Sequence, residues 1–365
     1  MIKYKININY SSAVHKINGA IFSKINEIKV LKKSFSIIFI LFFIFFIIPK
    51  YANNKLEIIR RIEPDTIKYN LVVPVILNDL EDLFQKKEYF EKYINFENLV
   101  IIAPDIIKVP DDKKNISIIK EDKLVPKSSL INIFTKRGIT ESKRLGWYEQ
   151  QFLKMSYSRV CDNEYYLLWD SDTFPVKPVQ MFENGHPIFD MKTEHHSAYF
   201  TTINRLIKNL HFSKFSYISE HMLIKTEYMR NLLDDIEHNS NIYGNMFWEK
   251  IIMSIDKSDI NKSGFSEFEL YGSYVDTKYP NFYKHRHWNS RRDMTIFYGN
   301  INNLDKYDFN WISKDFEAIT FEKRYKFDEK AYKYSKNLGI HDSIKAKFFF
   351  KFYKRIIKKY IIDLL

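Results

Sequence analysis

Between residues 69 and 103 the sequence alternates strand-like and helix-like segments, an order that few folds accept. Residues 69–76 and 98–103 are short, mostly apolar runs, which are typical of buried strands. Residues 79–94 between them have the spacing of a helix. Because a strand, a helix and a second strand in succession bring the two strands together in parallel, the sequence predicts an α/β fold.

The same pattern continues into the middle of the chain. A further strand is predicted at 116–119, a helix at about 142–160 and a central strand at 164–169. Asp170-Ser171-Asp172 follows the central strand directly. Ligands of open α/β sheets bind beyond the carboxyl ends of the strands, so the two aspartates stand where a site is expected.

No internal repeat and no long low-complexity linker interrupts the chain, so residues 66–340 are expected to form one domain. Three flanking parts are distinguished by composition: a basic N-terminal extension at 1–34, a hydrophobic segment at 35–49 and a basic, aromatic C-terminal helix at 341–365.

Composition excludes several classes of protein. The only cysteine is Cys161, which rules out an intramolecular disulfide and any metal site built from cysteines. A hydrophobic content of 45% excludes intrinsic disorder. The formal charge is +12, from 57 Lys and Arg against 45 Asp and Glu, but an AT-rich genome also encodes such a lysine excess. Since no RNA-binding or zinc-finger signature accompanies it, nucleic acid is not an expected partner.

The hydrophobic segment favours a membrane anchor. Residues 35–48 are an uncharged run of 14 residues. This is shorter than the ~20 residues that cross a bilayer squarely, so by length alone a core helix or a signal-peptide centre remains open. No small-residue cleavage site follows, which favours an uncleaved anchor. Five Lys or Arg residues flank each side, so the charge rule leaves its orientation undecided.

The C-terminal residues 345–365 mix aromatic and apolar side chains with seven Lys or Arg. Such a helix either lies on an anionic membrane surface or packs its apolar stripe on the domain. Membrane lipid is therefore an expected partner.

Asp170 and Asp172 are suited to a hard cation. One carboxylate could hold the ion while the other reaches a water or a sugar hydroxyl. Mg²⁺ and Mn²⁺ prefer oxygen ligands and keep positions open for substrate phosphates, which suits a nucleoside diphosphate. Asp-x-Asp alone also occurs by chance in surface loops, so its place at a strand end carries the argument.

Further segments add to this pattern: Arg144–Lys154, Tyr165–Thr173, Glu194–Phe200, Glu220–Leu223, Phe247–Glu249 and Ser263–Gly272. In this order they resemble the GT-A-like glycosyltransferase family of bacterial capsule and lipopolysaccharide loci. The resemblance implies a Rossmann-like fold with a mixed, mainly parallel sheet flanked by helices. It also implies a metal-dependent enzyme that moves a sugar from a nucleotide-sugar donor to a surface polysaccharide or a lipid-linked glycan.

The same resemblance implies roles for individual residues. Asp170 and Asp172 would bind Mn²⁺ or Mg²⁺, with Asp170 also near the nucleotide. The base that accepts the proton of the acceptor would be Glu267 or Glu269. The usual Glu-Asp pair is missing there, so inversion of the anomeric centre stays open. The other candidates are His285 or His287 as a further metal ligand, Arg144, Gln150, Arg286 and Arg291 for the nucleotide, and Glu194, His196, Glu220 and His221 for the acceptor.

Other interpretations use the same residues. Ser266 and Glu269 have the spacing of a helix-capping box, which needs no chemistry. Haloacid-dehalogenase-type phosphatases also carry Asp-x-Asp after a strand, and a non-catalytic membrane-bound scaffold is a third alternative. Because nucleotide sugars of bacteria reside in the cytoplasm and a lone cysteine suits a reducing compartment, we expect a catalytic domain that faces the cytoplasm. The oligomeric state is not predicted.

Overall fold

The computed structural model describes residues 67–104, 115–139, 144–329 and 331–332. These residues belong to a compact unit at Arg61–Asn337. The predicted extension at 1–34, hydrophobic segment at 35–49 and C-terminal helix at 341–365 lie outside them. Within the described part of the chain, no helix is long and apolar enough to cross a membrane.

A five-stranded sheet lies at the centre of the unit, in the order β3-β2-β1-β4-β8. Its first four strands are parallel, and β8 pairs antiparallel with β4. The predicted strands and the parallel pairing of β1 with β2 are therefore confirmed, and the fold is mixed α/β. The strands are β1 (Asn70–Pro74), β2 (Leu99–Ala103), β3 (Ile116–Lys120), β4 (Tyr165–Trp169) and β8 (His221–Lys225).

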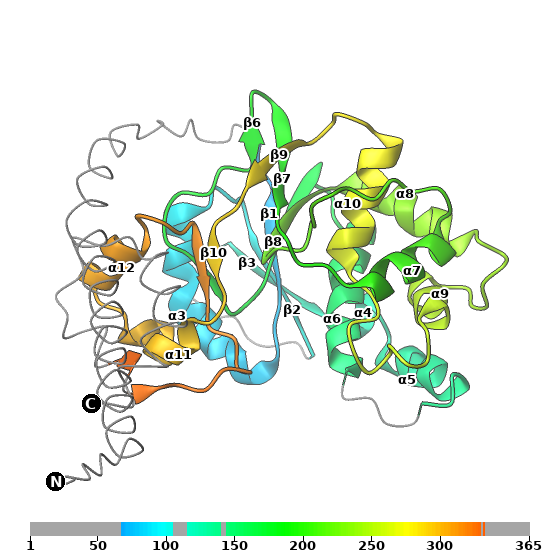
Figure 1. Ribbon diagram of the computed structural model, residues 1–365, viewed down its shortest axis with the longest axis horizontal. Coiled ribbons are helices and arrows are strands. Elements are labelled where there is room, and N and C mark those ends of the chain that lie inside the picture. Colours follow the sequence, from blue (N-terminus) through cyan, green and yellow to red (C-terminus); the bar gives the residue numbers. More distant parts are fainter. Residues whose placement is uncertain (1–66, 105–114, 140–143, 330, 333–365) are drawn as a thin grey trace, which may run out of the picture. The chain divides into compact units, whose positions relative to one another are not determined.

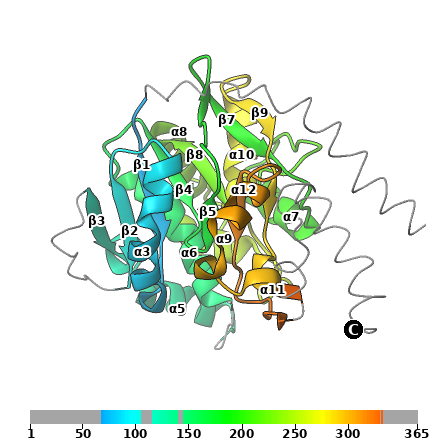
Figure 2. The ribbon, with the colours of Figure 1, turned by 90° about the vertical axis from the view of Figure 1, so that its left-hand side faces the viewer.

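Helices cover both faces of this sheet (Figures 1 and 2). Along β4, Tyr166 and Leu168 enter one hydrophobic cluster, whereas Leu167 and Trp169 enter the other, as the alternation of a strand requires. On one side lies α3 (Leu77–Tyr93), close to the predicted helix. The other side holds α4 (Glu121–Leu124), α5 (Lys127–Lys136), α6 (Leu145–Ser156) with the short helix η2 (Tyr157–Arg159), α7 (Ser197–Leu206), α8 (Thr226–Glu237), α9 (Phe247–Ser254) and α10 (Glu267–Lys278).

Two small sheets complete the fold. One has the order β6-β7-β9, with β6 (Phe182–Glu183), β7 (His186–Met191) and β9 (Lys284–His287). The other has the order β10-β11-β5, with β5 (Thr173–Pro175), β10 (Ser290–Arg291) and β11 (Ala318–Thr320). The remaining helices are α11 (Met294–Tyr298), η3 (Ile301–Asn303) and α12 (Lys306–Ile312).

The pairing of β5 with β11 decides where the C-terminal part of the unit lies. Thr173 and Thr320 are partners in an antiparallel ladder, and their hydroxyl groups are 2.7 Å apart. This ladder returns the chain to the segment that follows β4. Residues near 320 therefore lie beside the two aspartates, although about 150 positions separate them along the chain.

Candidate active site

Asp170, Ser171 and Asp172 form a tightly held turn after β4, here called the acidic turn. The Asp170 backbone N–H donates to the Glu220 carbonyl at 2.9 Å, and the Thr173 N–H donates to the Asp170 carbonyl at 3.1 Å. The Phe321 N–H donates to the Asp172 carbonyl at 2.9 Å. Bonds to β8 on one side and to the segment after β11 on the other fix the turn, so its carboxylates are preorganised.

Lys154 connects the acidic turn to helix α10. Its ammonium lies 2.8 Å from Asp170 Oδ1 and 3.0 Å from Glu267 Oε1, and its side chain is only 5% exposed. Burial disfavours the charged ammonium, but the two carboxylates outweigh this and raise the pKa of Lys154. The lysine is therefore charged at neutral pH and holds one carboxylate on either side.

Asp172 lies among like charges. The pKa of its carboxyl is raised to about 7, mainly by burial and then by the negative charges of Asp170 and Glu322, while Arg292 lowers it. Glu322 comes from the segment after β11, so the C-terminal part of the unit adds a carboxylate to the turn. The site carries more negative charge than its cations neutralise.

Arg292 is the cation that contacts several of these carboxylates, while Arg324 also contacts Glu322 and Lys192 lies 3.7 Å from Glu220. The Nε of Arg292 lies 2.7 Å from Glu322 Oε1 and 3.9 Å from Glu220 Oε1, and its Nη1 donates to Glu194 Oε2 at 3.1 Å. Burial disfavours its charge, but Glu322, Glu220 and Glu194 outweigh this and raise the pKa of Arg292. Glu194 and Glu220, both predicted acceptor contacts, thus lie at the same site as Asp172.

The start of α10 presents Glu267 and Glu269 in different surroundings. Ser266 caps the helix by accepting from the Glu269 N–H at 3.3 Å, as half of the predicted capping box. The side chain of Glu269 does not complete the box: its Oε2 accepts from Ser216 Oγ at 2.9 Å and from the Tyr217 N–H at 3.2 Å. Its Oε1 is buried without a hydrogen-bond partner.

Burial raises the pKa of Glu269 to about 7, the hydrogen bonds from Ser216 and Tyr217 lower it, and the charge of Glu194 raises it. Within the described part of the chain, no cation compensates Glu269 as Lys154 compensates Glu267. The two glutamates are therefore suited to different tasks, with Glu269 able to exchange a proton near neutral pH.

The close approach of α10 to the Tyr217 segment depends on a glycine. A Cβ atom on Gly272 would lie 2.2 Å from the Tyr217 ring. Without it, the helix and the segment that donates to Glu269 pack in direct contact.

His221 is placed differently from the predicted acceptor contact. Its ring is fully buried, stacked on Trp169 at 4.6 Å between centroids and against Trp288 at 4.5 Å. Its Nε2 lies 2.9 Å from Oδ2 of Asp190. The other oxygen of this carboxylate, Oδ1, lies 2.7 Å from Arg286 Nε. Burial raises the pKa of Asp190, but Arg286 and His221 outweigh this and hold it below its ordinary value. His221 thus supports the strand that carries the acidic turn.

Most of the other predicted residues contact another side chain. His196 contacts Glu194 at 3.2 Å, and Gln150 and Arg144 belong to α6 and its N-cap, with Arg144 over the Trp147 ring at 4.8 Å. Arg286 is paired with Asp190, and Arg291 with Asp293, the latter through Nη2 at 2.8 Å from Oδ2. His285 contacts Asp276 at 3.0 Å, and His287 lies exposed on β9.

The acidic turn offers the carboxylates of Asp170 and Asp172 as oxygen ligands for Mn²⁺ or Mg²⁺. Among the described residues, no group of three or more His, Cys, Asp and Glu side chains is arranged to hold a metal ion, so neither His285 nor His287 joins the two aspartates. Mg²⁺ is commonly held by one or two carboxylates together with substrate phosphates. Two preorganised aspartates with excess negative charge fit that mode.

Three residues at the site, Lys154, Arg292 and Glu322, had no role in the sequence-based prediction. The signal for Lys154 was its position three residues after Gln151, which places both on one face of α6. Gln151 Oε1 accepts from the Glu267 N–H at 3.1 Å, so this face points at the start of α10. Nothing local marks Glu322, which pairing of β11 with β5 brings to the site.

Fold and site together define a mixed α/β protein with an acidic turn at the carboxyl end of its central strand. The chain belongs to the family of unknown function DUF6492, whose model matches residues 76–333. No curated protein sequence matches the chain.

Solved structures similar to the chain include glycosyltransferases. They include the galactosyltransferase LgtC in complex with donor and acceptor sugar analogues, with 10% identity over 77% of this chain and 99% of that chain at a TM-score of 0.38. The apo form of the glycosyltransferase GlyE of Streptococcus pneumoniae TIGR4 has 12% identity over 78% of this chain and 64% of that chain, at a TM-score of 0.32. Mouse xyloside xylosyltransferase 1 has 10% identity over 71% and 99%, at 0.34.

Proposed function

We propose that this chain is a metal-dependent glycosyltransferase that moves a sugar from a nucleotide-sugar donor to a glycan or lipid-linked acceptor. The observation that carries the proposal is the acidic turn, which offers Asp170 and Asp172 at the carboxyl end of β4 with Lys154 joining Asp170 to Glu267. Ligands of α/β sheets bind at this edge.

Asp170 and Asp172 would hold Mn²⁺ or Mg²⁺ together with the diphosphate of the donor. A cation there supplies charge stabilisation to the leaving diphosphate. Arg292, which already lies among carboxylates, would pair a phosphate group at the turn.

Of the two predicted bases, Glu269 has the protonation behaviour that the reaction needs. A general base works best when its pKa lies near the operating pH, and the pKa of Glu269 is about 7. Its Oε1 is buried and has no hydrogen-bond partner among the described residues, so an acceptor hydroxyl that reaches it would find an unoccupied accepting oxygen. Glu267, bound to Lys154, would keep α10 and the acidic turn in register.

The proposal predicts metal-dependent nucleotide binding. With Mn²⁺ present, one nucleoside diphosphate or its sugar conjugate should raise the melting temperature of the full chain, because a ligand that binds only the folded state stabilises it by mass action. Asp170→Asn and Asp172→Asn should remove the shift, while the surface variant Asp256→Asn should keep it. Release of phosphate from p-nitrophenyl phosphate, with no shift for any nucleotide, would instead support the phosphatase.

Membrane association is part of the proposal and rests on the sequence alone. Residues 35–48 would anchor the chain, with the catalytic domain facing the cytoplasm, where the donor resides. After cell lysis we expect the full chain in the membrane fraction and a chain that begins at residue 61 in the soluble fraction. Recovery of both in the soluble fraction would contradict the anchor.

A further inference from the structure

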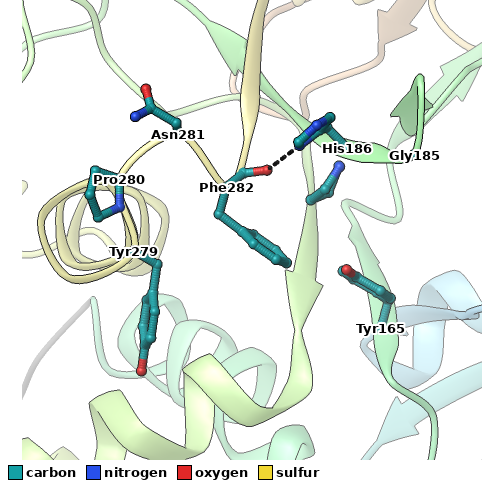
Figure 3. A pocket seen from close by; sticks show the side chains of 8 residues that line it. Tyr165, Gly185, His186, Tyr279, Pro280, Asn281 and Phe282 are labelled. Carbon is teal, nitrogen blue, oxygen red and sulfur yellow. Dashed lines mark hydrogen bonds between the residues drawn. The ribbon is translucent and has the colours of Figure 1, made fainter.

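A pocket of about 390 Å³ opens between two turns that lie apart from the acidic turn. One turn is the β6–β7 hairpin with Gly185 and His186, and the other comprises residues 279–282 between α10 and β9. Figure 3 shows the two turns facing each other, with the Phe282 ring between them and Tyr165 below the hairpin that carries His186.

The pocket is separate from the candidate active site. Tyr165 is the first residue of β4, whereas the acidic turn follows Trp169, the last. With a rise of about 3.3 Å per residue, roughly 13 Å of strand lies between the two ends. A ligand in this pocket therefore does not occupy the acidic turn.

Both turns are conformationally fixed. Asn184 and Gly185 have φ values of 52° and 77°, the left-handed pair that closes a two-residue hairpin. Asn281 has φ of 65° and follows Pro280, whose ring fixes its own φ. His186 Nδ1 lies 3.4 Å from the Phe282 carbonyl oxygen and links the turns. A preformed pocket loses little entropy when it binds a ligand.

The lining is aromatic and neutral. Tyr165, Tyr279 and Phe282 contribute rings, while Asn281 and His186 are exposed and offer hydrogen-bonding groups. Among the described residues that line it, there is no Asp, Glu, Lys or Arg. Ionic ligands require a compensating charge, whereas a neutral pyranose packs its C–H face on an aromatic ring and bonds its hydroxyls to amides and imidazoles.

We propose that this pocket binds a neutral sugar unit of a glycan. The pocket would hold a glycan at a distance from the reacting centre. The proposal goes beyond glycosyl transfer, because binding here requires neither a donor nor a metal.

Saturation-transfer NMR on the full chain tests this with the methyl glycosides of glucose, galactose and N-acetylglucosamine at about 10 mM, a concentration suited to weak sites. We expect at least one glycoside to bind. Asn281→Gly removes the amide but keeps a residue that accepts a positive φ, and should weaken binding up to about tenfold. Asn209→Gly, at another exposed asparagine with φ of 63°, is the matched control and should bind as the unchanged chain does.

Two more variants separate the possible results. Phe282→Ala should abolish binding, and Asp172→Asn should leave it intact, even if nucleotide binding by the unchanged chain fails. Equal binding by the unchanged chain and Asn281→Gly would overturn the proposal, as would no signal from any glycoside. A response to a proline-rich decapeptide alone would also overturn it and assign the pocket to a peptide.

Discussion

Lys154→Met should lower the free energy of unfolding by about 3–5 kcal/mol and abolish metal-dependent nucleotide binding. The substitution keeps an unbranched apolar stem but removes the ammonium between Asp170 and Glu267. Buried Glu267 and partly exposed Asp170 would then face each other without a cation. The cost arises from leaving charges uncompensated, and the acidic turn would lose the contact that holds Asp170. Denaturant unfolding and the melting-temperature shift with nucleotide and Mn²⁺ measure the two effects.

Lys87→Met is the matched control. Lys87 is also a mostly buried lysine, with 9% of its side chain exposed, but its partner Glu91 is 53% exposed. Its loss should cost at most about 1 kcal/mol and leave nucleotide binding unchanged. In the double variant Lys154→Met/Glu267→Gln one carboxylate is gone, so part of the lost stability should return. A double variant no more stable than Lys154→Met would show that the repulsion is not the cause.

Glu269→Gln should slow glycosyl transfer by about 10² to 10⁴ fold and change how stability depends on pH. Burial raises the pKa of Glu269 from 4.5 to about 7. Below pH 4.5 the carboxyl is protonated in both the folded and the unfolded chain. Between the two values the unfolded chain ionises first, so the folded state loses stability as the pH rises, and above about 7 the loss is complete.

The variant lacks this titration. The free energy of unfolding of the variant, relative to that of the unchanged chain, should therefore rise by about 3 kcal/mol between pH 4.5 and pH 8. Any pH-independent effect of the substitution on stability adds equally at both pH values. Unfolding titrations across this range, with sugar-nucleotide turnover at neutral pH, provide the measurement. A rate close to that of the unchanged chain would exclude Glu269 as the base and leave Glu267.

Asp308→Asn serves as the control for Glu269→Gln. Asp308 is a fully buried carboxylate that accepts from the Asp305 N–H at 3.0 Å and the Tyr298 hydroxyl at 3.3 Å, far along the chain from α10. Because an amide replaces accepting oxygens there, stability should fall by about 1 kcal/mol. Transfer should continue, since these two hydrogen bonds join Asp308 to Tyr298 and Asp305 and not to Asp170, Asp172 or Glu269.

The strands and the acidic turn were predictable because their signals are local. A buried strand such as Tyr165–Trp169 is an apolar run, and the edge at which it ends follows from its direction in the sheet. The half capping box of Ser266 likewise needs only the neighbouring residues of one helix. The antiparallel pairing of β8 with β4 has no such local signal, because an apolar run does not show whether the strand lies parallel or antiparallel to its neighbour.

The same distinction between local and long-range signals applies to the residues of the candidate site. The sequence determined the α/β core, Asp170 and Asp172 beyond β4, and two glutamates at a helix start. Only the tertiary structure decided that Lys154 joins Asp170 to Glu267 across 113 residues, that Glu322 and Arg292 surround Asp172, and that His221 is buried between two tryptophans. The physical reason is range: strand and cap signals act between near neighbours, whereas burial and charge pairing depend on which distant segments meet.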